Sequence, residues 1–105
     1  NPEAVPPSLS GRKKVEFVDA DKLGEDLLLR GWKHGDWFIP LGFGHRKKLS
    51  DFLVDEKVPL FEKSAVPVLE AHGDIVWVCG KRLDDRFKVT KGTRSVVRLT
   101  FSPVP

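Results

Sequence analysis

The chain is poor in cysteine, methionine and tyrosine. It contains one cysteine, Cys79, and no methionine or tyrosine. A single thiol excludes an internal disulfide and a zinc site built from several cysteines. Because Cys79 ends the apolar run Ile75–Cys79, we predict a buried and unreactive thiol. This cysteine usage is typical of a cytoplasmic protein.

Long apolar segments and targeting signals are also missing. No run approaches the ~20 apolar residues that cross a bilayer. Residues 1–11 are polar and rich in proline, unlike a secretory signal peptide. We therefore expect no membrane contact. Since the sequence also has no initiator methionine, we expect it to be a piece of a longer protein.

Patterns typical of catalysis, cofactor binding or metal binding are absent as well. There is no glycine-rich phosphate loop followed by Lys-Ser or Lys-Thr, and no Ser-Gly-Gly-x-Asp-Ser nucleotide loop. His34, His45 and His72 stand singly, without a second ligand at i+2 or i+4. The carboxylate pairs 19/21 and 84/85 flank turns, where aspartate usually caps an element. We predict no catalytic residue, no metal and no cofactor in this chain.

The composition is that of an ordinary globular domain. The 105 residues are 40% hydrophobic and 31% charged, which fits one soluble domain with a cooperative core. Residues 1–13 contain three prolines and two serines but no apolar period. We expect these residues to be a linker and residues 14–105 to form the domain.

Apolar periodicity predicts strands separated by two helices. The strands are expected at Val15–Val18, Leu27–Leu29, Val66–Glu70, Ile75–Cys79 and Ser95–Ser102. An amphipathic helix is expected from Lys47 to about Glu56, and Pro59 should take the first position of a second short helix. Strands, then helices, then strands favour an α+β fold over a βαβ winding.

The composition of each strand also predicts its burial. Leu27–Leu29 is a continuous apolar run and predicts a buried strand. Ile75–Cys79 is apolar on both faces and predicts a central strand covered on both sides. Ser95–Ser102 alternates between polar and apolar residues, which predicts a half-buried strand with one face in water.

The segment 29–53 carries positive charge next to tight turns. A strand containing Arg30 leads to a turn at Gly35 and Asp36, and the apolar run 37–39 leads to a glycine-rich turn at 40–44. Three consecutive cations at positions 46–48 follow and should open the helix. Cations this close repel one another, so folding alone gives no reason for their placement. Nucleic-acid phosphate would give one.

Positive charge is also concentrated near the end of the chain. The net charge is +3 at pH 7, but residues 81–98 hold seven cations and two carboxylates. This asymmetry predicts a basic face and an acidic face. The alternative is that these cations merely solvate a strand that is exposed on one side.

A series of short motifs, taken in order, resembles a known family. The motifs are Asp19–Leu23, Leu29–Trp32, Gly35-Asp36, Pro40–Gly42, Lys47–Phe52, Lys57–Pro59, Val66–Leu69, Ile75–Val78 and Gly80–Arg82. Over about Val15 to Phe101 this order closely resembles the C-terminal domain of bacterial tRNA(Ile)-lysidine synthetase. That enzyme uses ATP to adenylate the wobble cytidine of an isoleucine tRNA and then joins lysine to it. Its chemistry resides in an N-terminal nucleotide-binding domain.

The resemblance implies both a fold and a role. The fold is a layered α+β sandwich of mostly antiparallel strands with two short helices, similar to a domain of the phenylalanyl-tRNA synthetase β subunit. The role is non-catalytic recognition of isoleucine tRNA on its acceptor-stem side, beside the N-terminal catalytic domain of the same chain. ATP and Mg would belong to the parent enzyme, which could form a homodimer.

The resemblance and the local cations together predict the site. The tRNA contacts are expected at Arg30, Arg46, Lys47, Lys48, Lys63, Arg82 and Arg86. The turns that present them are expected to be shaped by Gly35, Asp36, Pro40 and Gly42. Two positions depart from the family, since Lys63 stands where relatives usually have arginine and Trp37 where arginine is frequent.

Two other readings of the chain remain open at this point. One is an architectural module that joins domains or a dimer without touching RNA. The other is a small independent enzyme, which the missing site residues disfavour. Salt-sensitive RNA binding would distinguish tRNA recognition from the architectural role.

Overall fold

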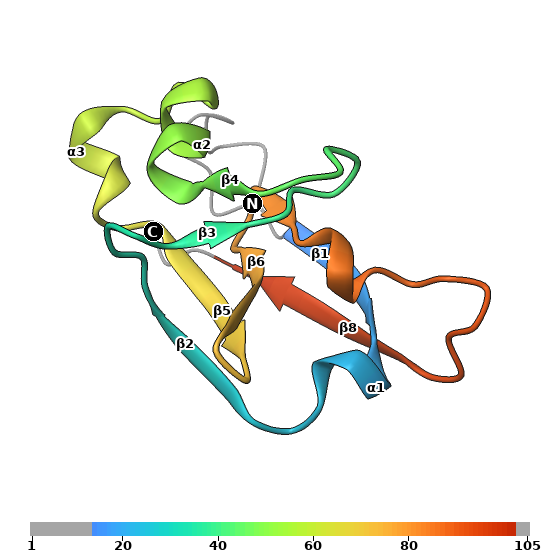
Figure 1. The fold of residues 1–105 in the computed structure, drawn as a ribbon. Coiled ribbons are helices and arrows are strands. Elements are labelled where there is room, and N and C mark those ends of the chain that lie inside the picture. The colour runs from blue at the N-terminus through green and yellow to red at the C-terminus, as the bar shows by residue number, and fades with distance from the viewer. Residues whose placement is uncertain (1–13, 103–105) are drawn as a thin grey trace, which may run out of the picture.

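The fold comes from a computed structural model that describes residues 14–102. These residues form three small antiparallel sheets, three short α-helices and one turn of 3₁₀-helix (Figure 1). The observed class is α+β, as the sequence predicts. The predicted linker, residues 1–13, lies outside the described residues. Among the described residues, no helix is long and apolar enough to span a bilayer.

The first and last strands form a two-stranded ribbon. β1 (Lys14–Asp19) pairs antiparallel with β8 (Val96–Phe101), with Lys14 opposite Phe101. Along β8, exposed and half-buried residues alternate, so the predicted half-buried strand is confirmed. Its half-buried members, Val97, Leu99 and Phe101, pack against the core.

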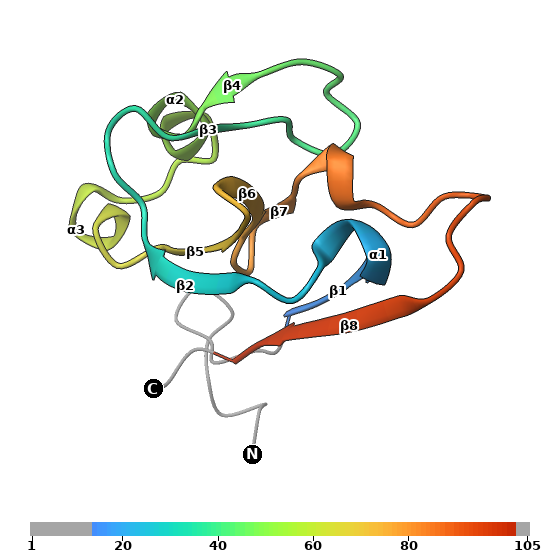
Figure 2. The same ribbon diagram turned by 60° about the horizontal axis from the view of Figure 1, so that its bottom comes forward.

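A four-stranded antiparallel sheet lies at the centre of the domain. Its order is β2 (Leu27–Gly31), β5 (Pro67–Ala71), β6 (Asp74–Val78) and β7 (Arg82–Leu83). Figure 2 shows the β1–β8 ribbon on one side of this sheet and helix α2 on the other. The elements are therefore layered, with the sheet in the middle.

The layer above the sheet contains the segment that sequence analysis singles out. It consists of β3 (Trp37–Phe38), β4 (Lys47–Lys48) and α2 (Leu49–Asp55). The next helix, α3 (Leu60–Lys63), lies beside β5 in Figure 2. The short helix α1 (Ala20–Leu23) and the 3₁₀ turn η3 (Asp85–Phe87) lie beside the ribbon and the sheet (Figure 1). α1 stands where a turn is predicted, because the Asp19 carboxylate caps it by accepting hydrogen bonds from the backbone N–H groups of Asp21 and Lys22.

Two apolar clusters form the core, one on each side of the central sheet. The first joins Phe38 to the apolar face of α2, and the second joins β1 and α1 to β7 and η3. Strand β6 contributes Ile75 and Val78 to the first cluster and Val76 and Trp77 to the second. The prediction of a central strand covered on both sides is therefore confirmed. Cys79 is buried too, and this burial raises the pKa of its thiol to about 11.

The predicted burial of Leu27–Leu29 is wrong. These leucines are 43%, 52% and 62% exposed. Within the described part of the chain, β2 is an edge strand that pairs with β5 alone. Its outer edge is therefore uncovered by these residues, and much of the area of its two faces is exposed. A short apolar run has the same sequence pattern in a central strand and in an edge strand.

Two helix starts also differ from the prediction. Lys47 and Lys48 pair with Phe38 and Trp37 as strand β4, and α2 begins only at Leu49. Lys48 is extended and occupies the N-cap position without a side-chain hydrogen bond to the helix, while the Leu49 N–H donates to the Asp36 carbonyl oxygen at 2.9 Å. Pro59 likewise occupies the N-cap position of α3 rather than its first helical position.

The packing of Phe38 generates a stability prediction. Its ring is fully buried and meets the Phe52 ring edge-on at a centroid distance of 5.0 Å. Phe38→Ala should lower the free energy of unfolding by about 3–5 kcal/mol, measured by urea denaturation. The control is Phe61→Ala on α3, where the ring is 83% exposed and a change within ~0.5 kcal/mol is expected. Equal unfolding midpoints for the two variants would contradict this core.

Candidate nucleic-acid interface

The loop between β3 and β4 is anchored at its base and projects at its tip. Pro40 is buried and bridges to Asp84, while the Leu41 N–H donates to the Leu83 carbonyl oxygen at 2.9 Å. The tip then turns at Gly42 and Gly44, whose φ angles of 83° and 88° favour glycine. In Figure 1 the loop extends past the end of β4, away from α3.

The three consecutive cations at the end of this loop lie in different surroundings. Arg46 is exposed, and its guanidinium carbon lies 4.0 Å from the centroid of the Trp37 ring, a cation–π contact. Lys47 is half-buried and forms an ion pair with Asp55 of α2. Lys48 is exposed. Neither Arg46 nor Lys48 forms an ion pair with a carboxylate of residues 14–102.

An open groove of about 510 Å³ runs between this loop and α2. It is lined by cations, carboxylates, two aromatic rings and a valine, namely Phe43, His45, Arg46, Lys47, Lys48, Asp51, Val54 and Asp55. Both signs of charge and an apolar surface therefore meet in one groove.

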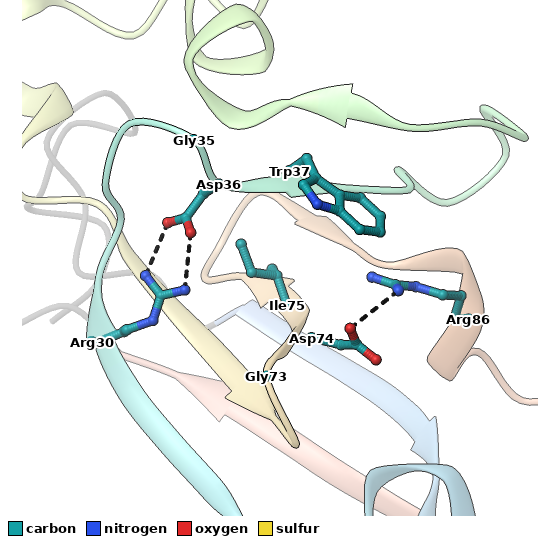
Figure 3. A pocket seen from close by; sticks show the side chains of 8 residues that line it. All are labelled: Arg30, Gly35, Asp36, Trp37, Gly73, Asp74, Ile75 and Arg86. Atoms are coloured by element: carbon teal, nitrogen blue, oxygen red, sulfur yellow. Dashed lines mark hydrogen bonds and ion pairs between the residues drawn. The ribbon is translucent and has the colours of Figure 1, made fainter.

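Arg30 lies within an internal ion network. Its guanidinium donates to both oxygens of Asp36, at 2.9 and 3.1 Å (Figure 3). It also donates to Glu70 at 2.8 Å. The hydrogen bond with Asp36 makes the largest contribution to a raised pKa of Arg30. The positive charge is thus matched by two carboxylates of the same domain. A tRNA contact by Arg30 stays a prediction.

Asp36 is the centre of the first turn. Besides Arg30, its carboxylate accepts the Lys33 N–H at 2.8 Å, and Gly35 beside it has a φ of 97°. Burial by itself would raise the pKa of Asp36, but the hydrogen bonds from Arg30 and Lys33 outweigh burial and hold that pKa below its ordinary value. This turn therefore fixes Arg30 and the start of β3 together.

Arg86 is also occupied by internal partners. Its side chain donates to the fully buried Asp84, with two hydrogen bonds of 3.0 Å, and lies 3.4 Å from Asp74. It also lies 4.9 Å from the centroid of Trp37. Figure 3 shows Arg86, Asp74 and Trp37 beside a small pocket of about 100 Å³ that Arg30 lines as well. A tRNA contact by Arg86 stays a prediction.

The two other predicted cations are less constrained. Arg82 on β7 donates to the Leu41 carbonyl oxygen at 3.5 Å, and its guanidinium lies 5.8 Å from the ring centroid of Phe52. It therefore belongs to the same side of the domain as the loop. Lys63 is half-buried on α3, where its backbone carbonyl accepts the Trp32 indole N–H at 2.6 Å. The contacts of Lys63 do not join it to the loop.

Five residues that line the groove are absent from the site predicted from the sequence. They are Phe43, His45, Asp51, Val54 and Asp55. The available signal was two aromatic rings alternating with glycines directly before three cations. Among the described residues, no group of three His, Cys, Asp or Glu side chains could hold a metal ion.

Comparisons with known proteins agree on one family. A family model described as "TilS substrate C-terminal domain" matches residues 27–99. A tRNA(Ile)-lysidine synthase of Parabacteroides distasonis is 45% identical over 89 residues, covering 85% of this chain and 20% of that protein. A second tRNA(Ile)-lysidine synthase, from Symbiobacterium thermophilum, is 41% identical over 106 residues, covering 98% of this chain and 22% of that protein. The chain thus spans about a fifth of the length of these curated relatives.

A solved structure agrees with the observed fold. The crystal structure of a TilS C-terminal domain superposes with a TM-score of 0.71 at 25% identity, covering 87% of this chain and 72% of that one. The layered α+β arrangement described above is therefore shared with that domain.

The Arg30–Asp36 pair generates a prediction of pH dependence. Because the folded pKa of Asp36 lies below its ordinary value of 3.8, its stabilisation is present above that value and disappears as the pH falls through the lower folded pKa. Asp36→Asn should cost about 2 kcal/mol of unfolding free energy near neutral pH. The difference from the unmodified chain should shrink in acid. Urea denaturation across the acidic range measures it.

The matched control is Glu56→Gln, which changes an exposed carboxylate at the end of α2. It should shift the free energy of unfolding by no more than ~0.5 kcal/mol at any pH. A constant penalty for Asp36→Asn at every pH would show that the charge of Asp36 is not what stabilises the turn.

Proposed function

This chain belongs to the family of C-terminal domains of tRNA(Ile)-lysidine synthase, and we propose that it binds tRNA by phosphate contacts from the β3–β4 loop and β4. The observation that carries the proposal is the pair Arg46 and Lys48. Both are exposed beside an open groove, and neither forms an ion pair with a carboxylate in residues 14–102. Uncompensated cations two positions apart attract a polyanion and release its counterions.

The stacking of Arg46 on Trp37 supports this role. A guanidinium held over an indole ring is already oriented, so less conformational entropy is lost when it binds a phosphate. Trp37 takes the position at which relatives frequently have arginine, yet it holds two guanidinium groups within 5 Å. The substitution thereby retains positive charge at this turn through its neighbours.

The remaining predicted residues divide into contacts and supports. Arg82 is proposed as a further phosphate contact because it lies against the same loop and α2. Lys47 contributes less, since Asp55 offsets its charge. Arg30 and Arg86 are proposed as supports that hold β3 in place through internal carboxylates. Lys63 is proposed as a further phosphate contact, separate from the loop.

The mode of recognition follows from the chemistry of these groups. Phosphate contacts position an RNA without reading its sequence, and duplex RNA hides its base edges in a deep, narrow groove. The partner is an isoleucine tRNA, bound on its acceptor-stem side. Ligation of lysine with ATP and Mg is assigned to the N-terminal catalytic domain of a cytoplasmic parent enzyme, which could be a homodimer.

A second candidate function is favoured by exposed apolar side chains. Leu27–Leu29 on the edge strand β2 are between 43% and 62% exposed, and Phe61 on α3 is 83% exposed. Apolar surface at an unpaired sheet edge is suited to contact with another protein surface. An architectural domain would pack these residues against the rest of the parent enzyme. Arg46 and Lys48 would then have no role in binding.

The phosphate contacts can be tested by a double substitution. Arg46→Ala/Lys48→Ala should weaken tRNA binding and make the plot of log affinity against log salt less steep by about 1.5–2 units. The control, Lys91→Ala/Arg98→Ala, removes the same charge from exposed residues of the η3–β8 loop and β8. It should leave the slope nearly unchanged. Equal slopes for both double variants would remove Arg46 and Lys48 from the interface.

Deletion of the domain distinguishes tRNA capture from an architectural role. In a full-length relative, removing the region equivalent to residues 14–102 should raise KM for tRNA while ATP binding is retained, because the nucleotide site is assigned to another domain. Steady-state ligation kinetics and equilibrium ATP titration measure the two quantities. An unchanged KM for tRNA would favour the architectural function instead.

A further inference from the structure

The groove beside the basic loop contains two aromatic rings in contact with each other. The ring centroids of Phe43 and His45 lie 4.1 Å apart, with 40° between the ring planes. Phe43 is 42% exposed and His45 is exposed as well. Both rings line the groove of about 510 Å³ between the loop and α2. Lys47 Nζ also lies 5.2 Å from the centroid of the Phe43 ring. The rest of the apolar ring area is left in water, which is unfavourable for the domain alone.

The backbone holds these rings at the tip of the loop. Phe43 lies between Gly42 and Gly44, and its N–H donates to the Pro40 carbonyl oxygen at 2.8 Å. A Cβ atom at either glycine would meet no other atom within 4 Å, so there is open space around the tip. The two rings are therefore fixed by a defined turn and are accessible from outside.

The charges in the groove indicate what can enter it. Asp51 and Asp55 line its α2 side, and Asp55 already pairs with Lys47. A phosphate placed next to these carboxylates would be repelled. Arg46 and Lys48 line the same groove, are exposed and have no carboxylate partner within residues 14–102. The groove thus suits a neutral, planar group next to the carboxylates, with its attached phosphates at Arg46 and Lys48.

We propose that this groove binds one unpaired nucleotide of the RNA, with its base stacked on Phe43 and His45 and its phosphates at Arg46 and Lys48. The inference rests on the proposed function, because the same two cations serve both. The groove falls within the ~300–1,000 Å³ typical of small-ligand sites. Paired bases are stacked inside the duplex, so the nucleotide must be single-stranded. Such a contact would fix the position of an RNA end or bulge on the domain. The phosphate contacts alone recognise only the charge of the RNA backbone.

The test compares two RNA hairpins with the same stem, one blunt and one with a 3′ overhang of a few nucleotides. The 105-residue chain should bind the overhang hairpin about tenfold more tightly than the blunt one, by base stacking. Phe43→Ala should abolish this advantage and leave the affinity for the blunt hairpin unchanged. Phe61→Ala, which removes a more exposed ring on α3, should retain the advantage.

A spectroscopic readout reports stacking directly. A 2-aminopurine in the overhang should lose fluorescence on binding the unmodified chain, because stacking on an aromatic ring quenches it. Phe43→Leu keeps apolar bulk at the tip but has no ring, and it should bind without quenching. Phe43→Leu also replaces Phe43→Ala in the hairpin comparison if Phe43→Ala fails to fold. The thermal midpoint of Phe43→Ala would show whether it folds.

The outcomes separate this inference from the proposed function. An equal preference for overhang RNA in the unmodified chain and in the Phe43 variants would overturn the stacking site. So would the absence of any preference in the unmodified chain. In either case, salt-dependent binding of the blunt hairpin that needs Arg46 and Lys48 would leave the phosphate contacts standing. Salt-independent binding of the blunt hairpin would overturn the phosphate contacts of Arg46 and Lys48. The phosphate-binding part of the proposed nucleotide site would then be wrong as well.

Discussion

The carboxylate of Asp84 is fully buried, and its loss of water is compensated by hydrogen bonds from the Ile39 N–H, the Arg86 N–H and the Arg86 guanidinium. The Asp84 N–H donates to the Val76 carbonyl oxygen at 2.7 Å, so one residue joins the central strand β6, the end of β3 and the turn η3. The base of the basic loop is fixed through this junction, since Pro40 bridges to Asp84 as well. A buried carboxylate without these donors would cost several kcal/mol, so the layers of the domain depend on this set of contacts.

The arrangement of charge differs from what a count along the chain suggests. The stretch 81–98 has an excess of cations, but Arg86, Lys88 and Arg94 each form an ion pair with an aspartate. Asp84 and Asp85 supply two of these partners, and Asp21 of α1 supplies the third. The proposed interface is instead concentrated at Arg46 and Lys48. Cations with internal partners stabilise the fold, and cations without them are available to a ligand.

The parts of the fold that the sequence predicts correctly are those determined by neighbours along the chain. The alternation in β8 and the unbroken apolar run in β6 are local patterns, and both strands have the predicted burial. The partners of Arg30 could not be predicted, because Glu70 lies 40 positions away and is brought close only by the β2–β5 pairing. The exposure of Leu27–Leu29 depends in the same way on which strands lie beside β2. In the candidate site, the run of cations at 46–48 is visible in the sequence. The groove beside it depends on the position of α2 against the loop.

The pairing of the first and last strands affects how the domain responds to mechanical force. Lys14 lies opposite Phe101 at one end of the antiparallel β1–β8 ribbon. Tension applied between these two residues would act across the strands and break the ribbon's hydrogen bonds one after another, as in a zipper. Antiparallel ribbons loaded in shear must instead lose many hydrogen bonds at once. The ribbon would therefore open at low force, exposing the apolar side chains of Val97 and Leu99 before the central sheet is disturbed.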